Sequence, residues 1–230
     1  MKLEILADAD AVARRAASIV AADARAAVAA RGRFLLAVSG GRTPWAMLRA
    51  LSGEDVPWNS VHVFQVDERI APAGDPDRNL THLAESLLSR APLPPAQLHA
   101  MPVEAADSGV AALKYARTLE KLAGSPPVLD LAHLGLGPDG HTASLVPNDP
   151  VLDVTDRSVA VTGVYRGRRR MTLTFPVLNR ARSVLWLVTG RKKVGMLKRL
   201  LAHDATIPAG RVRPDSAFVL VDRAAAGEGP

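Results

Sequence analysis

The sequence predicts an α/β fold, in which a mostly parallel sheet is flanked by helices on both faces. Short, continuous apolar runs alternate along the chain with longer segments whose apolar residues recur at helical spacing. Continuous apolar runs are typical of parallel strands that are buried on both faces. Glycine-rich or polar stretches directly follow several of these runs, as expected where a parallel strand ends and turns toward a helix.

The first elements show this pattern most clearly. Asp8 or Asp10 can cap a helix whose apolar residues recur as far as Val28, and Gly32 is suited to end it. The apolar run 34–38 then predicts a buried strand, because it is continuous and glycines follow it. Thr43 and Pro44 favour a new helix, with Thr43 as its cap and Pro44 at the first helical position.

The same alternation continues to the end of the chain. Hydrophobic periodicity predicts the later helices at 80–89, 110–122 and 192–201, and apolar runs predict the later strands at 61–66, 129–136, 170–175, 184–188 and 218–221. No internal repeat or linker divides the sequence, so we expect one domain over 1–230, with 223–230 as a flexible tail.

Composition excludes several classes of protein. The chain has 230 residues, 48% of them hydrophobic, which suffices for one substantial core. It has no cysteine, so disulfides, thiolate metal sites and cysteine nucleophiles are excluded. No apolar run approaches the roughly 18 residues that a membrane helix needs, and acidic residues occupy the start, where a signal peptide would be apolar. We therefore expect a soluble cytoplasmic protein without a membrane partner.

The positive charge is concentrated toward the C-terminal part of the chain. Between Arg166 and Arg213 there are 13 Lys or Arg residues against one acid, Asp204. This segment is suited to meet an anion, although surplus surface arginine is an equal alternative for most of these residues. Nucleic acid is not expected as a partner, because only 4% of the residues are aromatic and no zinc-finger or RNA-recognition pattern occurs.

The glycine stretch after the strand at 34–38 is the first candidate site. Ser39, Gly40 and Gly41 precede Arg42 and Thr43, where the next helix begins. Glycines let a backbone approach a ligand closely, and the start of a helix presents free N–H groups to a phosphate. The stretch lacks the Gly-Lys-Ser/Thr ending of a Walker loop, so nucleotide hydrolysis is not implied. A tight turn with a good cap is the structural alternative.

Two acids and an arginine follow the strand at 61–66. Asp67, Glu68 and Arg69 place opposite charges where a strand meets solvent, which suits sugar hydroxyls and phosphate. Taken alone, this pattern is equally typical of an ion-paired surface turn.

The third candidate is the stretch GLGPDGHTAS at 135–144. It matches G-x-G-x-x-G by spelling, but Pro138 interrupts the pattern and no strand ends in an acid about 20 residues later, so dinucleotide binding is disfavoured. A rigid loop that presents Asp139 and His141 remains. Histidine exchanges protons near neutrality, and a nearby carboxylate can fix its tautomer. A purely structural histidine is the alternative.

Arg170 and Lys193 complete the candidate set. They begin a strand and a helix respectively, and they can supply fixed and mobile positive charge to one phosphate. The neighbouring cations are expected on the solvated face: Arg166, Arg168, Arg169, Lys192, Lys198 and Arg199. No metal site and no serine-hydrolase motif is present, since neither H-E-x-x-H nor G-x-S-x-G occurs.

Five motifs occur in an order that resembles the 6-phosphogluconolactonase family: SGGRTP, DER followed by Asn79, GLGPDGHTASL, RMTLT and GRKK. The resemblance runs from about residue 5 to 223. It implies the sheet architecture shared with glucosamine-6-phosphate deaminase, ribose-5-phosphate isomerase and CoA transferase-like proteins. It also implies that the chain opens 6-phosphoglucono-1,5-lactone to 6-phosphogluconate without a cofactor. Independently of the resemblance, we expect a monomer or small homo-oligomer, and the sequence does not choose between them.

The resemblance also implies roles for individual residues. His141 would be the general base that activates water, and Asp139 would orient it. Ser39, Gly40, Gly41, Arg42 and Thr43 would line the substrate cradle, Arg69, Arg170 and Lys193 would hold the phosphate, and Asp67 would meet sugar hydroxyls. Turnover is then expected to fall as the pH drops through about 6 to 7, where imidazole becomes protonated.

Two alternatives remain open. The related deaminases carry an acid five residues beyond the histidine, where this chain has Val146. The lactonase family more often has Phe there, and both side chains are apolar. A third possibility is a sugar-phosphate-binding module without turnover, against which the complete Asp-Gly-His loop argues.

Overall fold

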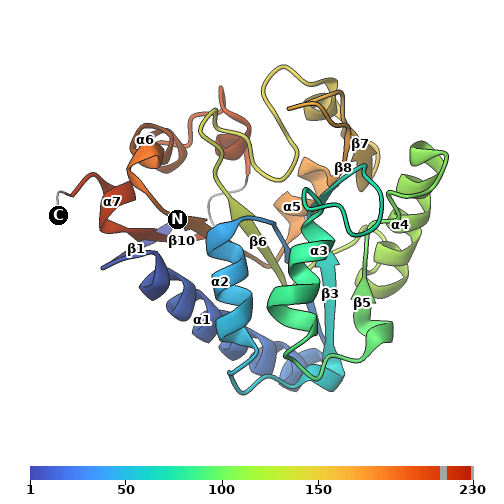
Figure 1. The fold of residues 1–230 in the computed structure, drawn as a ribbon, viewed down its shortest axis with the longest axis horizontal. Coiled ribbons are helices and arrows are strands. Elements are labelled where there is room, and N and C mark those ends of the chain that lie inside the picture. The colour runs from blue at the N-terminus through green and yellow to red at the C-terminus, as the bar shows by residue number, and fades with distance from the viewer. Residues whose placement is uncertain (213–216, 229–230) are drawn as a thin grey trace.

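The protein is built on a parallel sheet, which confirms the predicted α/β class. The structure is a computed structural model that describes residues 1–212 and 217–228. In the described chain, this sheet has seven strands in the order β1-β10-β9-β6-β2-β3-β5, and every neighbouring pair is parallel (Figure 1). The strands are β1 (Lys2–Leu6), β2 (Phe34–Val38), β3 (Val61–Gln65), β5 (Leu98–His99), β6 (Leu131–Gly135), β9 (Ser183–Val188) and β10 (Ala217–Asp222).

Three further strands of the described chain form a second, antiparallel sheet. It contains β4 (Asp67–Arg69), β8 (Arg170–Leu173) and β7 (Val159–Val161), in the order β4-β8-β7. The strand expected at 170–175 is therefore not part of the parallel sheet, and it ends at Leu173 because helix α5 (Phe175–Arg180) begins with Pro176 in its first turn. The pairing of β4 with β8 sets Arg69 opposite Arg170, which brings two predicted site residues together.

Helices cover both faces of the parallel sheet (Figure 1). One face packs against α1 (Ala9–Arg31), α2 (Arg42–Leu51) and α3 (Asn79–Leu83), and the π-helical turn Ala84–Leu88 continues α3. The other face packs against α4 (Ser108–Ala123), α5, α6 (Val194–Leu201) and the small sheet. Short 3₁₀ turns connect these elements at Trp58–Ser60, Pro95–Gln97, Pro150–Asp153, Arg191–Lys193 and Pro208–Arg211.

Strand β2 shows why its apolar run is continuous. Phe34, Leu36 and Val38 face the α1–α2 layer, whereas Leu35 and Ala37 face the opposite layer. Alternate residues of a strand point to opposite faces, so a strand covered on both faces must be apolar throughout.

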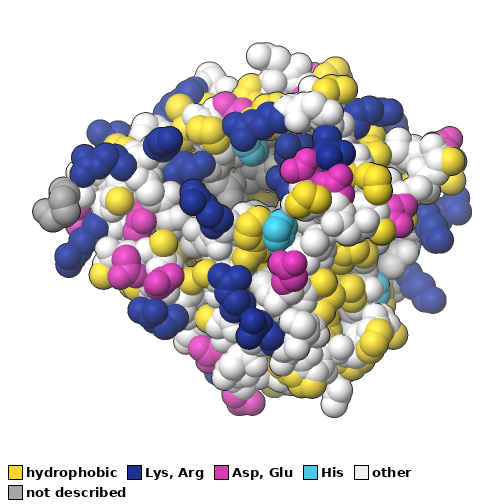
Figure 2. Space-filling view, viewed as in Figure 1, with side chains coloured by type: hydrophobic (Ala, Val, Ile, Leu, Met, Phe, Trp, Pro, Cys, Tyr) yellow, Lys and Arg dark blue, Asp and Glu magenta, His cyan; other side chains and the backbone are white. Residues whose placement is uncertain are grey.

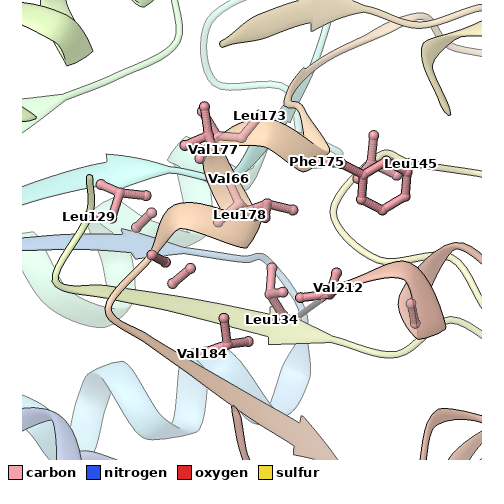
Figure 3. Close-up of a cluster of buried hydrophobic side chains, with 14 of the residues drawn as sticks. Val66, Leu129, Leu134, Leu145, Leu173, Phe175, Val177, Leu178, Val184 and Val212 are labelled. Carbon is pink, nitrogen blue, oxygen red and sulfur yellow. The ribbon is translucent and has the colours of Figure 1, made fainter. Parts of the chain in front are cut away.

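The second core layer fills the space between the two sheets. Figure 3 shows Val177 and Leu178 of α5 beside Leu173 of β8, while Leu134 and Val184 belong to the parallel sheet below. All five side chains are fully buried. Burial of each such side chain contributes roughly 1.5–3 kcal/mol, so this layer fixes the small sheet on the large one.

The helix ends confirm part of the sequence prediction. Asp8 caps α1 by accepting a hydrogen bond from the N–H of Ala11 at 2.7 Å, and Gly32 ends that helix. Thr43 does not cap α2: the helix begins at Arg42 after Gly41, and the Thr43 hydroxyl instead hydrogen bonds the Thr189 hydroxyl at 2.6 Å. A threonine inside the first turn can no longer satisfy the N–H groups that an N-cap reaches.

Part of the segment expected to be a flexible tail is helical. Residues Arg223–Ala226 form a short helix, α7, whose first turn is capped by Asp222. The side chain of Ala225 is fully buried against the second core layer, which holds this segment on the body of the protein. Residues 229 and 230 lie outside the described chain. Within the described ranges, no helix is long and apolar enough to cross a membrane.

Candidate active site

A polar cleft of about 330 Å³ opens beyond the carboxyl ends of β2, β6 and β9, next to the small sheet. Figure 2 shows Lys and Arg side chains gathered around this hollow. Every site residue expected from the sequence except Asp139 lines the cleft: Ser39, Gly40, Gly41, Arg42, Thr43, Asp67, Arg69, His141, Arg170 and Lys193. Segments far apart in the sequence therefore meet at one place, as the parallel sheet requires.

Asp139 holds His141 in the cleft. Nδ1 of His141 lies 2.5 Å from Oδ1 of Asp139, and the His141 side chain is 18% exposed. Because a carboxylate accepts hydrogen bonds, this contact places the ring proton on Nδ1. No group in the described chain hydrogen bonds Nε2, which is left with its lone pair for a ligand.

The protonation states of this pair suit a base. Burial lowers the pKa of His141 below its ordinary value of 6.5, and Asp139 opposes that shift without reversing it. Asp139 has a pKa of about 2: burial raises it, but the charge of His141 and hydrogen bonds from His141 and Tyr165 outweigh burial. Near neutral pH the pair is therefore a neutral imidazole beside a carboxylate.

The loop itself forces the His141 ring into place. A Cβ built on Gly137 would lie 2.1 Å from Nδ1 of His141, so only glycine leaves room for the imidazole. The N–H of Gly137 also donates to the carbonyl of His141 at 2.8 Å.

The glycine stretch after β2 is fixed from below. The N–H of Ser39 donates to Nδ1 of the buried His133 at 3.2 Å, and the Ser39 hydroxyl donates to the His133 carbonyl at 2.9 Å. A Cβ on Gly40 would lie 1.8 Å from Oδ1 of Asn79, so the loop can reach this position only with glycine there. These contacts hold the loop backbone along the wall of the cleft.

The acids after β3 have separate structural partners. Asp67 accepts hydrogen bonds from the Ser144 hydroxyl at 2.6 Å and from the Asn79 amide at 3.2 Å. Glu68 is completely buried and does not reach the cleft; it accepts from the N–H groups of Asn79 and Leu80, both at 2.7 Å. The surface-turn alternative is therefore excluded for this stretch.

Cationic side chains line the cleft beside the histidine. Arg170 is 7% exposed, and its terminal nitrogen lies 3.5 Å from the Ser144 hydroxyl. Lys193 donates from Nζ to the carbonyl of Leu136 at 2.5 Å, and burial lowers its pKa. Arg69 donates to Oδ1 of Asn79 at 2.6 Å. Three cations from separate elements thus face one small volume, which suits a dianionic phosphate.

Sequence reasoning missed three side chains at this site. Asn79 was noted only as part of a motif, yet it links Asp67, Arg69 and the glycine loop. Arg166 is exposed as expected, but it also lines the cleft. Tyr165 donates from its hydroxyl to Oδ2 of Asp139 at 2.8 Å. Arg166 and Tyr165 belong to no motif, because their positions depend on a single turn of the chain.

The described residues include no group of three or more His, Cys, Asp or Glu side chains arranged to hold a metal ion. The donor set of the cleft is instead suited to hydrogen bonds and phosphate.

Comparison with known proteins agrees with this geometry. The family described as glucosamine-6-phosphate isomerases/6-phosphogluconolactonase matches residues 7–221. A 6-phosphogluconolactonase of Synechocystis sp. is 37% identical over 99% of this chain and 97% of its own length. The crystal structure of 6-phosphogluconolactonase from Thermotoga maritima covers 96% of this chain and 98% of its own, with 29% identity and a TM-score of 0.86.

A monomeric glucosamine-6-phosphate deaminase shares the fold at 18% identity, with a TM-score of 0.86 and 99% coverage of both chains. The fold therefore does not separate lactonase from deaminase, and the side chains of the site must do so. The match over 7–221 and the Synechocystis relative nevertheless establish that the chain belongs to the glucosamine-6-phosphate isomerase/6-phosphogluconolactonase family.

Proposed function

We propose that this chain hydrolyses 6-phosphoglucono-1,5-lactone to 6-phosphogluconate, with His141 as the general base. The observation that carries the proposal is the position of the His141 imidazole, which Asp139 fixes through Nδ1 in a cleft that arginine and lysine side chains line. The chain is a hydrolase, and two relatives that it matches over 97% and 96% of their own length are 6-phosphogluconolactonases.

The chemistry needs only positioning and one proton carrier. Nε2 of His141 takes a proton from water while the water oxygen attacks the lactone carbonyl carbon, which forms a tetrahedral oxyanion. The imidazolium then returns the proton to the ring oxygen as the carbon–oxygen bond breaks. Asp139 stabilises the transient positive charge and keeps the proton on Nδ1. A δ-lactone is an activated ester, so a covalent nucleophile is not required.

The remaining predicted residues bind the substrate in this proposal. Arg69, Arg170 and Lys193 hold the phosphate, since their cationic groups face the same cleft. Asp67 accepts a hydrogen bond from a sugar hydroxyl. The loop Ser39, Gly40, Gly41, Arg42 and Thr43 lines the cradle and supplies backbone N–H groups.

Deamination on the same scaffold is disfavoured by one position. The acid that would assist ring opening is replaced by Val146, whose side chain is 4% exposed and carries no ionisable group. Release of ammonia from glucosamine 6-phosphate would establish deaminase activity instead. Ligand binding without product would indicate a sugar-phosphate-binding module.

Replacing His141 tests the proposal directly. His141→Ala should lower kcat by roughly 100-fold or more, because the proton carrier is lost. The measurement is 6-phosphogluconate formation after subtraction of spontaneous lactone hydrolysis. His203→Asn is the matched control, since His203 is exposed outside the cleft, and its turnover should equal that of the wild type. A folded His141→Ala protein with wild-type turnover would reject the assignment.

The pH profile gives a second readout of the same assignment. The active form is the neutral imidazole, and burial lowers the pKa of His141. The active form therefore persists below pH 6.5, and the fall in kcat/KM should lie below that value rather than across pH 6 to 7. The residual activity of His141→Ala should lack this acid limb.

We further propose a cytoplasmic location, as a monomer or small homo-oligomer. A phosphorylated sugar lactone is charged and does not cross a bilayer unaided, so its hydrolase belongs in the compartment where the lactone forms. Cell fractionation and light scattering test these two points.

A further inference from the structure

Tyr165 lies at the tip of a hairpin between β7 and β8. Its N–H donates to the carbonyl of Arg168 at 2.9 Å, and the N–H of Arg168 donates back at 3.3 Å. The two residues between them, Arg166 and Gly167, both have positive φ, 51° and 79°. Positive φ at both central positions is the pattern of a type I′ turn, which matches the twist of the flanking strands. The tyrosine therefore has a defined position despite being in a loop.

The hairpin is tied to the segment that precedes α3. The guanidinium of Arg168 forms ion pairs with Asp75 at 2.9 Å and with Asp77 at 2.8 Å. A planar guanidinium that contacts two carboxylates resists rotation more than a single surface pair does. The hairpin tip is thus held at the rim of the cleft, where Arg166 contributes to the lining.

The phenol of Tyr165 reaches the acid of the catalytic pair. Its hydroxyl donates to Oδ2 of Asp139 at 2.8 Å, while Oδ1 of the same carboxylate lies 2.5 Å from Nδ1 of His141. The Tyr165 and His141 rings also meet edge to face, with centroids 5.5 Å apart. Burial and the charge of Asp139 raise the pKa of Tyr165, so the phenol remains a donor at neutral pH.

The ring of Tyr165 also contacts two cations of the cleft. The guanidinium carbon of Arg170 lies 5.0 Å from the ring centroid, and that of Arg166 lies 5.2 Å from it. Both distances are within the range of cation–π attraction. One side chain therefore touches the carboxylate, the imidazole and two cationic groups.

We propose that Tyr165 is a positioning residue that fixes the Asp139 carboxylate through its hydroxyl and supports Arg166 and Arg170 through its ring. The hydroxyl occupies one carboxylate oxygen, which leaves the other aimed at His141. The phenol keeps its proton throughout. This inference rests on the proposed lactonase function for its kinetic readouts, and on the geometry alone for its spectroscopic one.

Two substitutions separate the two contacts. Tyr165→Phe keeps the ring and removes the hydroxyl, so we expect kcat to fall about tenfold while KM changes less than twofold. Tyr165→Leu removes the ring as well, so we expect KM to rise further, because Arg166 and Arg170 lose their support. The control is Val164→Ala in the same hairpin; Val164 is 71% exposed, and its kinetics should be unchanged.

A histidine titration by NMR tests the hydroxyl contact without turnover. The His141 signal is assigned by its loss in His141→Gln. Without the phenol, Asp139 pairs more strongly with the imidazolium, so the pKa of His141 and the acid limb of kcat/KM should both move upward in Tyr165→Phe.

The inference is overturned if Tyr165→Phe leaves kcat, the acid limb and the His141 titration unchanged. It is also overturned if kcat falls together with thermal stability while the titration does not move, because that result would indicate a structural role only. Should the wild type fail to hydrolyse the lactone, the proposed function fails, and the titration still decides the role of Tyr165.

Discussion

At the scale of single residues, the site depends on how tightly the imidazole of His141 is enclosed. Asp139 fixes Nδ1, and Gly137 packs directly against the same nitrogen. Burial keeps the ring neutral, and its neighbours determine which nitrogen is free. The ability of His141 to act as a base therefore depends on the surrounding loop as well as on the imidazole itself.

Gly137→Ala should lower kcat although it leaves the side chains of His141 and Asp139 chemically unchanged. The new Cβ would overlap Nδ1 of His141 at 2.1 Å, so the ring must move away from Asp139. A misplacement of about 1 Å can cost around 100-fold in rate, and we expect kcat to fall by at least tenfold. Steady-state kinetics measure the effect. Gly195→Ala is the control, because a Cβ there meets no atom within 4 Å.

An alanine variant at Gly137 that keeps both kcat and the wild-type pH profile would show that the ring can move freely. That outcome would contradict the enclosed imidazole described above.

At the scale of secondary structure, α3 is organised by the carboxylate of Glu68. This side chain is fully buried and accepts from the first N–H groups of the helix, at Asn79 and Leu80. It also accepts from the Gln65 amide at 2.8 Å and lies 3.4 Å from the buried guanidinium of Arg78. A negative charge at a helix start is stabilised by the free N–H groups there. The position of Asn79, and with it the glycine loop, follows from this contact.

Glu68→Gln should therefore destabilise the fold. The substitution keeps the shape, removes the charge beside Arg78, and turns an NH₂ group toward backbone donors. Loss of one partner of a buried ion pair costs about 3–5 kcal/mol, so we expect the free energy of unfolding to fall by about 3 kcal/mol in urea denaturation. The control Glu85→Gln alters an exposed acid near the same helix and should stay within about 0.5 kcal/mol of wild type. Equal stabilities of the two variants would contradict this role of Glu68.

The sequence predicted most of the parallel sheet but not the small one. The runs at 34–38 and 184–188 are apolar throughout, so burial on both faces was visible in them. In contrast, β4 consists of Asp67, Glu68 and Arg69, a sequence that is typical of a polar turn. Its strand geometry comes from pairing with β8, a contact about a hundred residues distant that local pattern cannot reveal.

The same limit applies to the site. Motif spacing identified His141, Arg170 and Lys193, and all three line one cleft. Tyr165 and Arg166 were not found, because their contacts arise from a turn with positive φ and from ion pairs to a distant segment. Site residues that belong to a sequence motif can be predicted from the sequence, whereas residues that depend on tertiary contacts for their position cannot.

At the scale of the whole molecule, the cleft lies where the parallel sheet meets the small one. The loops after β2 and β6 supply the glycine cradle and His141, and β4 and β8 supply Asp67, Arg69 and Arg170. The shared core layer in Figure 3 holds the two sheets together. That packing therefore sets the distance between His141 and the cations proposed to bind the phosphate.

One buried group links this packing to pH. His133 lies in the centre of the parallel sheet, is 0% exposed, and accepts the N–H of Ser39 at Nδ1. Burial lowers the pKa of His133 to about 3 in the folded protein, against about 6.5 in the unfolded chain. Between these two pH values, His133 is neutral in the folded protein and protonated in the unfolded chain. In that window the unfolded chain binds more protons, and folding stability must fall as the pH falls.

We expect His133 alone to contribute a slope of about 1.4 kcal/mol per pH unit between pH 5.5 and 4.5. His133→Asn keeps an acceptor for Ser39 and removes the titration, so its stability should decline less steeply with acid than that of the wild type. Urea unfolding at each pH measures both curves, and the difference at pH 8, where histidine is neutral in either state, isolates the cost of the smaller side chain. Parallel curves for the two proteins would contradict the buried, neutral state of His133, because a histidine that protonates in place would give no slope.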